Sequence, residues 1–191
     1  MKNSIAFGLV ALFAATAVSL GRVAPAPQAP PEETISGSIS ATRTVTQNAR
    51  LTGDVTCTVQ GAPCIQLAAA GITINLNGFT VSGVGDPSTG CQGNNTANEI
   101  GIAATNQSDV TIQGPGLIQR FRADGVFLSN STRMRVANVT TSTNCFSGIR
   151  VVNLSDSDIE SNVAVRNGTT LIPCGATAAI DGYGNLIIQA N

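Results

Sequence analysis

The sequence contains no histidine, and Lys2 is its only lysine. Charged residues make up only 11% of the chain and aromatic residues only 4%. Histidine is the side chain that most often serves as a general base or a metal ligand near neutral pH. Any acid–base chemistry would therefore have to rest on carboxylates and arginine.

Basic residues are also too few for a nucleic-acid partner. The formal net charge is −1. Loss of a leader carrying Lys2 and Arg22 would leave eight arginines against eleven acids, a balance of −3. Because nucleic-acid binding requires a clustered basic face, we expect none.

The residues that dominate are Asn, Thr, Ser, Gly, Val and Ile. Such a mixture is typical of β-strands joined by tight turns rather than of helices. It is not typical of disorder, because disordered chains are poor in β-branched residues and rich in charge.

The N-terminus has the features of an export signal. Lys2 precedes an apolar stretch from Ile5 to Leu20, and small residues follow it. We therefore predict a signal peptide over 1–26, a Pro-rich linker over 27–34 and a folded domain over 35–191. An uncleaved membrane anchor is the alternative; after cleavage we expect no membrane span and a secreted, periplasmic or cell-surface location.

Five cysteines follow the leader, and in an exported chain they are disulfide candidates. Cys57 and Cys64 flank a short turn, so we predict a bridge between them. For Cys145 we favour Cys174 over Cys91, because Cys145 and Cys174 would occupy the same turn on adjacent repeats. The odd thiol is free, paired between chains, or missing a partner lost by truncation. A metal site is disfavoured because the spacing is not CxxC and no histidine is present.

An internal repeat begins at Gly101, Gly125 and Gly148, which are 24 and 23 residues apart. The repeat aligns apolar positions in three columns, and it aligns three asparagines at the first turn. The apolar columns are Ile102, Val126, Ile149; Ala104, Leu128, Val151; and Ile112, Val136, Ile159. The asparagines are Asn106, Asn130 and Asn153.

This period indicates short strands that cannot bury their apolar faces alone. No helical periodicity lies between the aligned strands, so a crossover helix is excluded. If each turn of chain stacks on the next, equivalent strands pair in parallel and the inward aliphatic residues form one continuous core. We therefore predict an all-β fold, a right-handed single-stranded parallel β-helix of about five coils, with the aligned asparagines hydrogen-bonded as a ladder.

Three stretches carry a resemblance to a known family: VTCTVQGAPCI from Val55, ITINLNGFTVSG from Ile72 and DVTIQGPGLI from Asp109. Over residues 50–167 the chain resembles the pectin-lyase-like right-handed parallel β-helix repeat proteins. This resemblance implies the fold. It does not select a function, because that scaffold hosts lyases, hydrolases, epimerases, adhesins and proteins with no known reaction.

The enzymes of that family use residues that this chain has only in part. Polygalacturonases use carboxylates and a histidine, and the Asp-Pro-His-Asp motif of uronate epimerases is reduced here to Asp86-Pro87-Ser88-Thr89. Pectate lyases use a calcium cluster of acids with an arginine base. The ingredients for that alternative are Arg120, Arg122, Asp124, Arg150, Asp156 and Asp158.

Strand alternation places Ala103, Phe127 and Arg150 outward on one sheet. Phe127 beside Arg150, with Arg120, Arg122 and Asp124 in the preceding turn, would form an aromatic and cationic strip for an acidic sugar chain. Ordinary exposed surface is the alternative reading. Arg135 and Asp158 should face outward at equivalent positions of neighbouring coils and form a surface ion pair.

We therefore expect an exported non-catalytic protein that binds polysaccharide or serves as cell-surface structure. We assign no catalytic residue, no metal and no cofactor. A polysaccharide lyase or uronate epimerase acting on an acidic glycan is the alternative, and calcium belongs only to it. An ice-binding surface is disfavoured because Arg135 and Asp158 interrupt the column of Thr73 and Thr111.

The C-terminus ends without a visible cap. The run Ile188–Asn191 echoes Ile159–Asn162, after which a further strand would be expected. Either the chain is truncated or its last coil docks on a partner, and end-to-end self-association is one such arrangement.

Overall fold

The computed structural model describes residues 32–85, 91, 96–168 and, for the backbone alone, 184–189. The signal peptide predicted for 1–26 lies outside these residues, as do Asp86–Thr89 and Cys174. The predicted linker ends too late, because the first strand already begins at Glu33. No helix in the described part of the chain has the length and hydropathy needed to cross a membrane.

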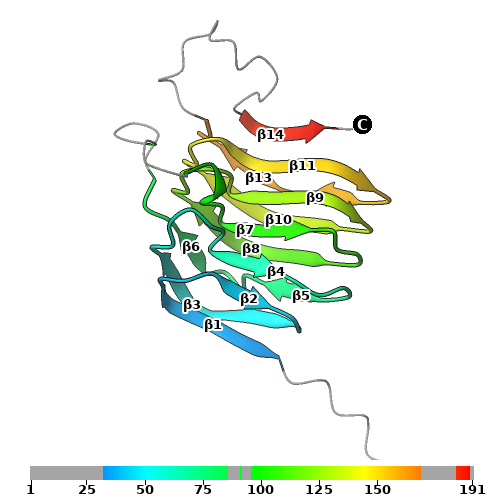
Figure 1. The fold of residues 1–191 in the computed structure, drawn as a ribbon, viewed down its shortest axis with the longest axis horizontal. Coiled ribbons are helices and arrows are strands. Elements are labelled where there is room, and N and C mark those ends of the chain that lie inside the picture. The colour runs from blue at the N-terminus through cyan, green and yellow to red at the C-terminus, as the bar shows by residue number, and fades with distance from the viewer. Residues whose placement is uncertain (1–31, 86–90, 92–95, 169–183, 190–191) are drawn as a thin grey trace, which may run out of the picture.

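The described chain is almost entirely β-structure, arranged as two parallel sheets (Figure 1). Sheet A contains β1 (Glu33–Ile39), β3 (Ala49–Cys57), β5 (Thr73–Asn75), β6 (Thr80–Ser82), β8 (Thr111–Gln119), β10 (Arg135–Ser142), β12 (Asp158–Glu160) and β13 (Val163–Val165). Sheet B contains β2 (Arg43–Val45), β4 (Ile65–Leu67), β7 (Ile102–Thr105), β9 (Val126–Thr132), β11 (Ser147–Ser155) and β14 (Gly184–Gln189). One short 3₁₀ helix, η1, covers Thr96–Asn98. The all-β prediction is confirmed.

The chain alternates between the two sheets, and we call one pass through both sheets a rung. It leaves sheet B at a first corner, bends within sheet A, and returns to sheet B at a second corner. Long strands such as β8 pair with both β5 and β6 of the preceding rung, so they cover both sides of the bend. The strands therefore stack from the blue N-terminal end to the red C-terminal end (Figure 1).

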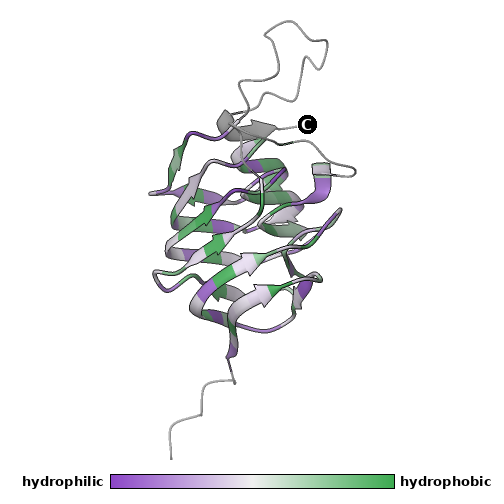
Figure 2. Cartoon of the chain, turned by 90° about the vertical axis from the view of Figure 1, so that its left-hand side faces the viewer, coloured by the Kyte–Doolittle hydropathy of each residue, from purple (hydrophilic) through white to green (hydrophobic). Residues whose placement is uncertain are grey.

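The three predicted apolar columns are confirmed by the strand register. Ile102, Val126 and Ile149 are paired in sheet B, and Ile112, Val136 and Ile159 are paired in sheet A. The third column, Ala104, Leu128 and Val151, is likewise paired. Apolar stretches recur on successive strands of the stack (Figure 2).

The inward residues of both sheets form one core. Leu128, Val136 and Ile112 are fully buried in the same cluster, although they come from different sheets. Each such side chain contributes about 1.5–3 kcal/mol when it leaves water. Because no strand supplies more than a few of them, the core exists only where rungs stack.

The repeated glycines are required by close approach between rungs. A Cβ placed on Gly125 would lie 2.7 Å from the carbonyl oxygen of Gly148 and 2.7 Å from the side-chain nitrogen of Asn144. A Cβ placed on Gly101 would lie 2.5 Å from the carbonyl oxygen of Gly125. All three distances are shorter than real Cβ atoms essentially ever show, so the glycines recur because neighbouring rungs approach too closely there for a side chain.

The predicted asparagine ladder is exposed, and a second ladder is buried. Asn153 donates a hydrogen bond to Asn130 (2.9 Å), as predicted for the first corner. At the second corner the amide of fully buried Asn144 donates to Asn167 (2.9 Å) and to the carbonyl of Ile118 (3.3 Å). The Asn144 side-chain oxygen accepts the backbone N–H of Phe121 (3.0 Å).

Two disulfides join described cysteines. The predicted Cys57–Cys64 bridge is confirmed, with its Cα atoms 6.0 Å apart. Cys145 is bonded to Cys91, with Cα atoms 5.7 Å apart, so the predicted Cys145–Cys174 bridge is wrong. Cys91 lies between β6 and β7 in the sequence, and its disulfide joins it to the second corner of a later rung, where Cys145 lies.

The predicted correspondence of the C-terminal run Ile188–Asn191 with Ile159–Asn162 is also wrong, because the two runs lie in different sheets. Ile188 pairs with Val151 in sheet B, rather than following Ile159 in sheet A. The pattern of one apolar residue and a polar run is common to both sheets, so it could not distinguish them.

The buried ladder generates a stability prediction. Asn144→Ala would leave the Phe121 N–H and the Ile118 carbonyl without their partner, at about 1–3 kcal/mol for each buried group. We expect the free energy of unfolding in urea to fall by at least about 2 kcal/mol. Asn130→Gly is the matched control, because it removes an exposed ladder bond while keeping the left-handed backbone, and should cost well under half as much. Equal losses would contradict the assignment of the second corner as the structural ladder.

Candidate functional site

The outward residues of sheet B form the column that was predicted from alternation. Ala103 pairs with Phe127, and Phe127 pairs with Arg150, on three successive rungs. The Cζ atom of Arg150 lies 5.5 Å from the centre of the Phe127 ring. This distance is within the range of a cation–π interaction, so the guanidinium is positioned on the aromatic ring.

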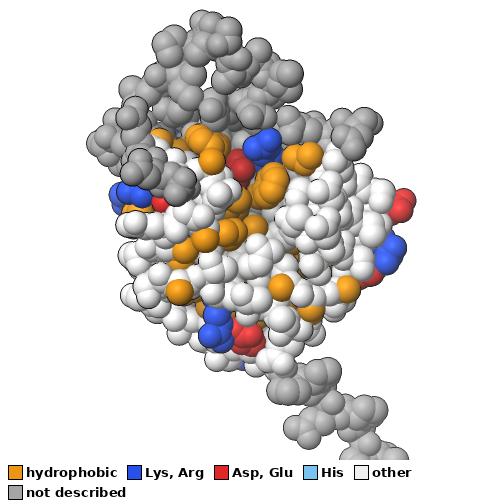
Figure 3. Space-filling view, viewed as in Figure 1, with side chains coloured by type: hydrophobic (Ala, Val, Ile, Leu, Met, Phe, Trp, Pro, Cys, Tyr) orange, Lys and Arg blue, Asp and Glu red, His pale blue; other side chains and the backbone are white. Residues whose placement is uncertain are grey.

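A small apolar cluster surrounds this column on the outside of the sheet. Ile100, Ala103 and Ala123 are buried in it, and Phe127 and Phe146 pack against them. It is separate from the main core. In Figure 3, apolar side chains form a band across the face that β9 and β11 occupy in Figure 1, with basic and acidic side chains beside it. The site is thus a largely apolar surface with charges at its margin.

The three charged residues predicted at the second corner have different environments. Arg120 is exposed, and its Nε donates to the carbonyl of Gly85 (3.4 Å). Arg122 is engaged in an ion pair with Glu99 (3.2 Å). Asp124 is only 2% exposed, and its carboxylate accepts the backbone N–H of Ser147 (3.0 Å). Asp124 therefore holds the start of β11 and does not offer its carboxylate to the surface.

Glu99 is the residue of this region that sequence reasoning did not connect to Arg122. Its side chain is 4% exposed, and it also accepts the N–H of Gly61 (3.2 Å). Hydrogen bonds between backbone groups place Glu99, Ala123 and Phe146 at equivalent positions of successive rungs. The sequence signal that could have identified Glu99 was an acid at a repeat position where the later rungs have the apolar residues Ala123 and Phe146.

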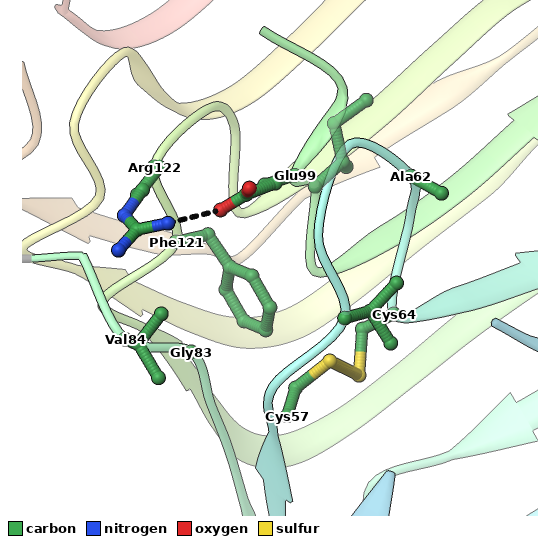
Figure 4. Close-up of a pocket in the computed structure, with 10 residues that line it drawn as sticks. Cys57, Ala62, Cys64, Gly83, Val84, Glu99, Phe121 and Arg122 are labelled. Atoms are coloured by element: carbon green, nitrogen blue, oxygen red, sulfur yellow. Dashed lines mark hydrogen bonds and ion pairs between the residues drawn. A yellow bond between two sulfur atoms is a disulfide. The ribbon is translucent and has the colours of Figure 1, made fainter. Parts of the chain in front are cut away.

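The Glu99–Arg122 pair borders a cavity of about 10 Å³. Figure 4 shows the paired groups on one side, the Phe121 ring below them and the Cys57–Cys64 disulfide beside the ring. This volume is about that of one water molecule, so it is too small for a sugar.

The acids named for a calcium cluster are not brought together. Asp124 contacts Ser147 at the start of β11, whereas Asp156 follows the end of that strand and Asp158 begins β12. A nine-residue strand at about 3.3 Å per residue separates them by roughly 25–30 Å. Within the described ranges, no three Asp, Glu, Cys or His side chains are grouped as a metal site would require.

The predicted surface ion pair has a different partner. Arg135 and Asp158 are in register, as expected. However, Arg135 forms its ion pair with Glu160 (2.6 Å) and also donates to Gln113 (3.0 Å). The long arginine side chain reaches diagonally across the strands, and the shorter Asp158 does not receive it.

A column of alternating charge lies at the first corner. Arg133 donates two hydrogen bonds of 2.6 Å to the carboxylate of Asp109, one rung below. These bonds hold the pKa of Asp109 below its ordinary value, and the same contact raises the pKa of Arg133. Asp156, on the next rung, contributes a further attraction to Arg133.

The chain matches no protein-family model, no curated protein and no solved structure.

The buried pair generates a prediction at the site. Glu99→Gln should lower the free energy of unfolding by about 1–3 kcal/mol, because a charged hydrogen bond inside the protein is replaced by a neutral one. Glu160→Gln is the control, since its pair with Arg135 is 42–53% exposed and should contribute at most about 1 kcal/mol. Urea denaturation measures both, and a Glu99 variant as stable as the Glu160 variant would refute a structural role for the buried pair.

The first corner generates a pH prediction. The folded pKa of Asp109 lies below its unfolded value, so its stabilising contribution is present above the unfolded pKa of about 3.9. That contribution disappears as the pH falls through the folded pKa. In NMR titrations, Arg133→Gln should return the Asp109 pKa toward its ordinary value. An Asp109 pKa that is the same in both proteins would show that Arg133 does not set it.

Proposed function

We propose that this chain is an exported, non-catalytic protein that binds an acidic polysaccharide on the outer face of sheet B, as a free binding protein or as a cell-surface component. The observation that carries the proposal is the guanidinium of Arg150 held over the Phe127 ring in an outward column. Phe127 and Phe146 are only partly buried where they pack against the apolar cluster around Ala103, so they supply the adjoining surface.

The chemistry of these groups fits an acidic sugar polymer. A guanidinium can form two parallel hydrogen bonds with one carboxylate, and such charge-assisted bonds contribute about 1.5–3 kcal/mol. Partly exposed aromatic rings such as Phe127 can contact the carbon-bound hydrogens of a sugar ring. Because Arg150 is oriented on Phe127, little side-chain entropy would be lost on binding.

The proposal includes the architecture. We propose that the two parallel sheets belong to a right-handed parallel β-helix of the pectin-lyase-like type. Support comes from paired strands 23 or 24 residues apart, such as Val126 with Ile149, and from alternation of the chain between the sheets. Crossovers between parallel strands are right-handed in almost all proteins, which favours this hand.

Export is supported by two observations. Disulfides persist in oxidising compartments, and the described residues form two of them. They are compatible with an extracellular or periplasmic location. The apolar N-terminal stretch has the composition of a signal peptide.

Affinity electrophoresis in gels that contain polygalacturonate tests the binding function, with neutral dextran as the comparison polymer. We expect retardation by polygalacturonate alone. Phe127→Ala and Arg150→Gln should each weaken binding about tenfold or more, which corresponds to about 1.4 kcal/mol. Arg133→Gln is the matched control, since it removes an exposed arginine at the first corner.

Two results would count against this function. One is equal retardation by dextran and polygalacturonate, which would remove the role of the carboxylates. The other is the appearance of unsaturated uronate absorbance on incubation with polygalacturonate, with or without calcium, which would establish the lyase alternative.

A further inference from the structure

Two inward columns of the core end on charged residues at the N-terminal end of the stack. Strand register defines the two columns, one in each sheet. From the C-terminal end, the sheet A column is Ile159, Val136, Ile112, Ile74, Ala49 and Glu33, and the sheet B column is Leu186, Ile149, Val126, Ile102, Ile65 and Arg43. Apart from Glu33 and Arg43, every residue in them is aliphatic. The first rung therefore differs from all later described rungs in the chemistry that it places at the end of the core.

Glu33 and Arg43 are bonded to each other across that end. The Nε and Nη2 atoms of Arg43 each lie 2.6 Å from the same carboxylate oxygen, Oε1 of Glu33. The Glu33 side chain is 15% exposed and the Arg43 side chain is 52% exposed. The next residues of the two columns, Ala49 and Ile65, are fully buried. The ion pair thus joins sheet A to sheet B where the aliphatic core stops.

The order of the strands would allow a second copy of the chain to stack head to tail. The first described strand, β1, belongs to sheet A, and the last, β14, belongs to sheet B at the opposite end of the stack (Figure 1). Because the chain alternates between the sheets, β1 of one copy could pair with β12 and β13 of another, and β2 could pair with β14. Such stacking would continue both sheets, and it would place Glu33 on Ile159 and Arg43 on Leu186.

We infer that Glu33 and Arg43 form a charged cap that prevents a second copy of this chain from stacking on β1 and β2. Stacking would remove both charged groups from water and set them against aliphatic residues, which offer no hydrogen bonds in exchange. Inward-pointing charges at an open sheet edge are one means by which β-proteins avoid pairing with other chains. The inference concerns self-association and does not depend on the binding of a polysaccharide.

Sedimentation velocity of the full exported chain over a range of protein concentrations tests the cap. The wild-type protein should show no species that grows with concentration. The variant E33V/R43V extends both aliphatic columns to the end of the stack. It should therefore form species of dimer size or larger, and their proportion should rise with concentration.

The matched control is E32V/R50V. It removes the neighbouring ion pair, whose side chains are 41% and 46% exposed, and it adds two valines at the same end of the stack. Arg50 alternates with the buried residues Ala49 and Leu51, so its side chain faces solvent rather than the core. This control should sediment like the wild type.

Ile159→Lys locates the contact, because it places a charge at the opposite end of the sheet A column. Added to E33V/R43V, it should abolish the larger species. Association that persists in E33V/R43V/I159K would overturn the head-to-tail arrangement. So would a wild-type protein that assembles and loses its assembly through Ile159→Lys alone.

Two further results would refute the cap. One is a folded E33V/R43V that sediments like the wild type, and the other is a control E32V/R50V that associates as strongly as E33V/R43V. The urea midpoint of E33V/R43V should equal or exceed that of the wild type, because aliphatic residues can replace an ion pair without loss of stability. If that variant does not fold, E33Q/R43Q removes the same charges, and it must associate with rising concentration for the cap to stand.

Discussion

Parallel strands are hydrogen-bonded at a spacing of about 4.8 Å, so the backbone of each rung must follow the same course as the backbone of the rung beneath it. The backbone shows this constraint most directly at its changes of direction. In the described residues, eleven of the twelve non-glycine residues with positive φ fall into four columns of stacked positions. These columns are Asn106, Asn130, Asn153; Asp109, Arg133, Asp156; Asn138, Ser161; and Arg120, Thr143, Arg166. Left-handed backbone is costly for residues such as Arg and Thr, so the hydrogen bonds of the stack must compensate for it.

The same constraint explains which parts of the fold could be predicted. Inward aliphatic residues and glycines recur because the core and the close approach of Gly125 to the next rung act on every strand. The buried ladder does not recur in the same way, since Phe121 occupies the turn below Asn144 and donates its backbone N–H to the Asn144 side-chain oxygen. Alignment of the repeats therefore identified the exposed asparagines, because the same residue type occurs on each rung. It did not identify the buried pair, because the position is occupied by Phe121 on one rung and by asparagine on the next two.

Interactions outside the repeat were the least predictable. Cys91 lies in the long segment between β6 and β7, where no repeated column fixes its position in the stack, and Glu99 is an acid at a position where later rungs have Ala123 and Phe146. Their partners, Cys145 and Arg122, lie on later rungs at the second corner. Of the predicted strip, the contact between Phe127 and Arg150 could be deduced, because strand register alone determines it. The separation of Asp124 from the surface could not, because it depends on how the corner folds over the strand ends.

These irregular contacts also determine how firmly the outer surface of sheet B is held. Ile100 and Ala123 belong to the apolar cluster beside Phe127, and both come from corner segments rather than from strands. Glu99, the neighbour of Ile100, is bonded to Gly61 and Arg122, and the disulfide of Cys145 fixes the corner next to Phe146. A repetitive stack provides a flat sheet with no feature that distinguishes one rung from another. The contacts of Cys91 and Glu99 distinguish three rungs from the rest of the stack, and a binding surface with little to reorder loses less entropy when it binds a ligand.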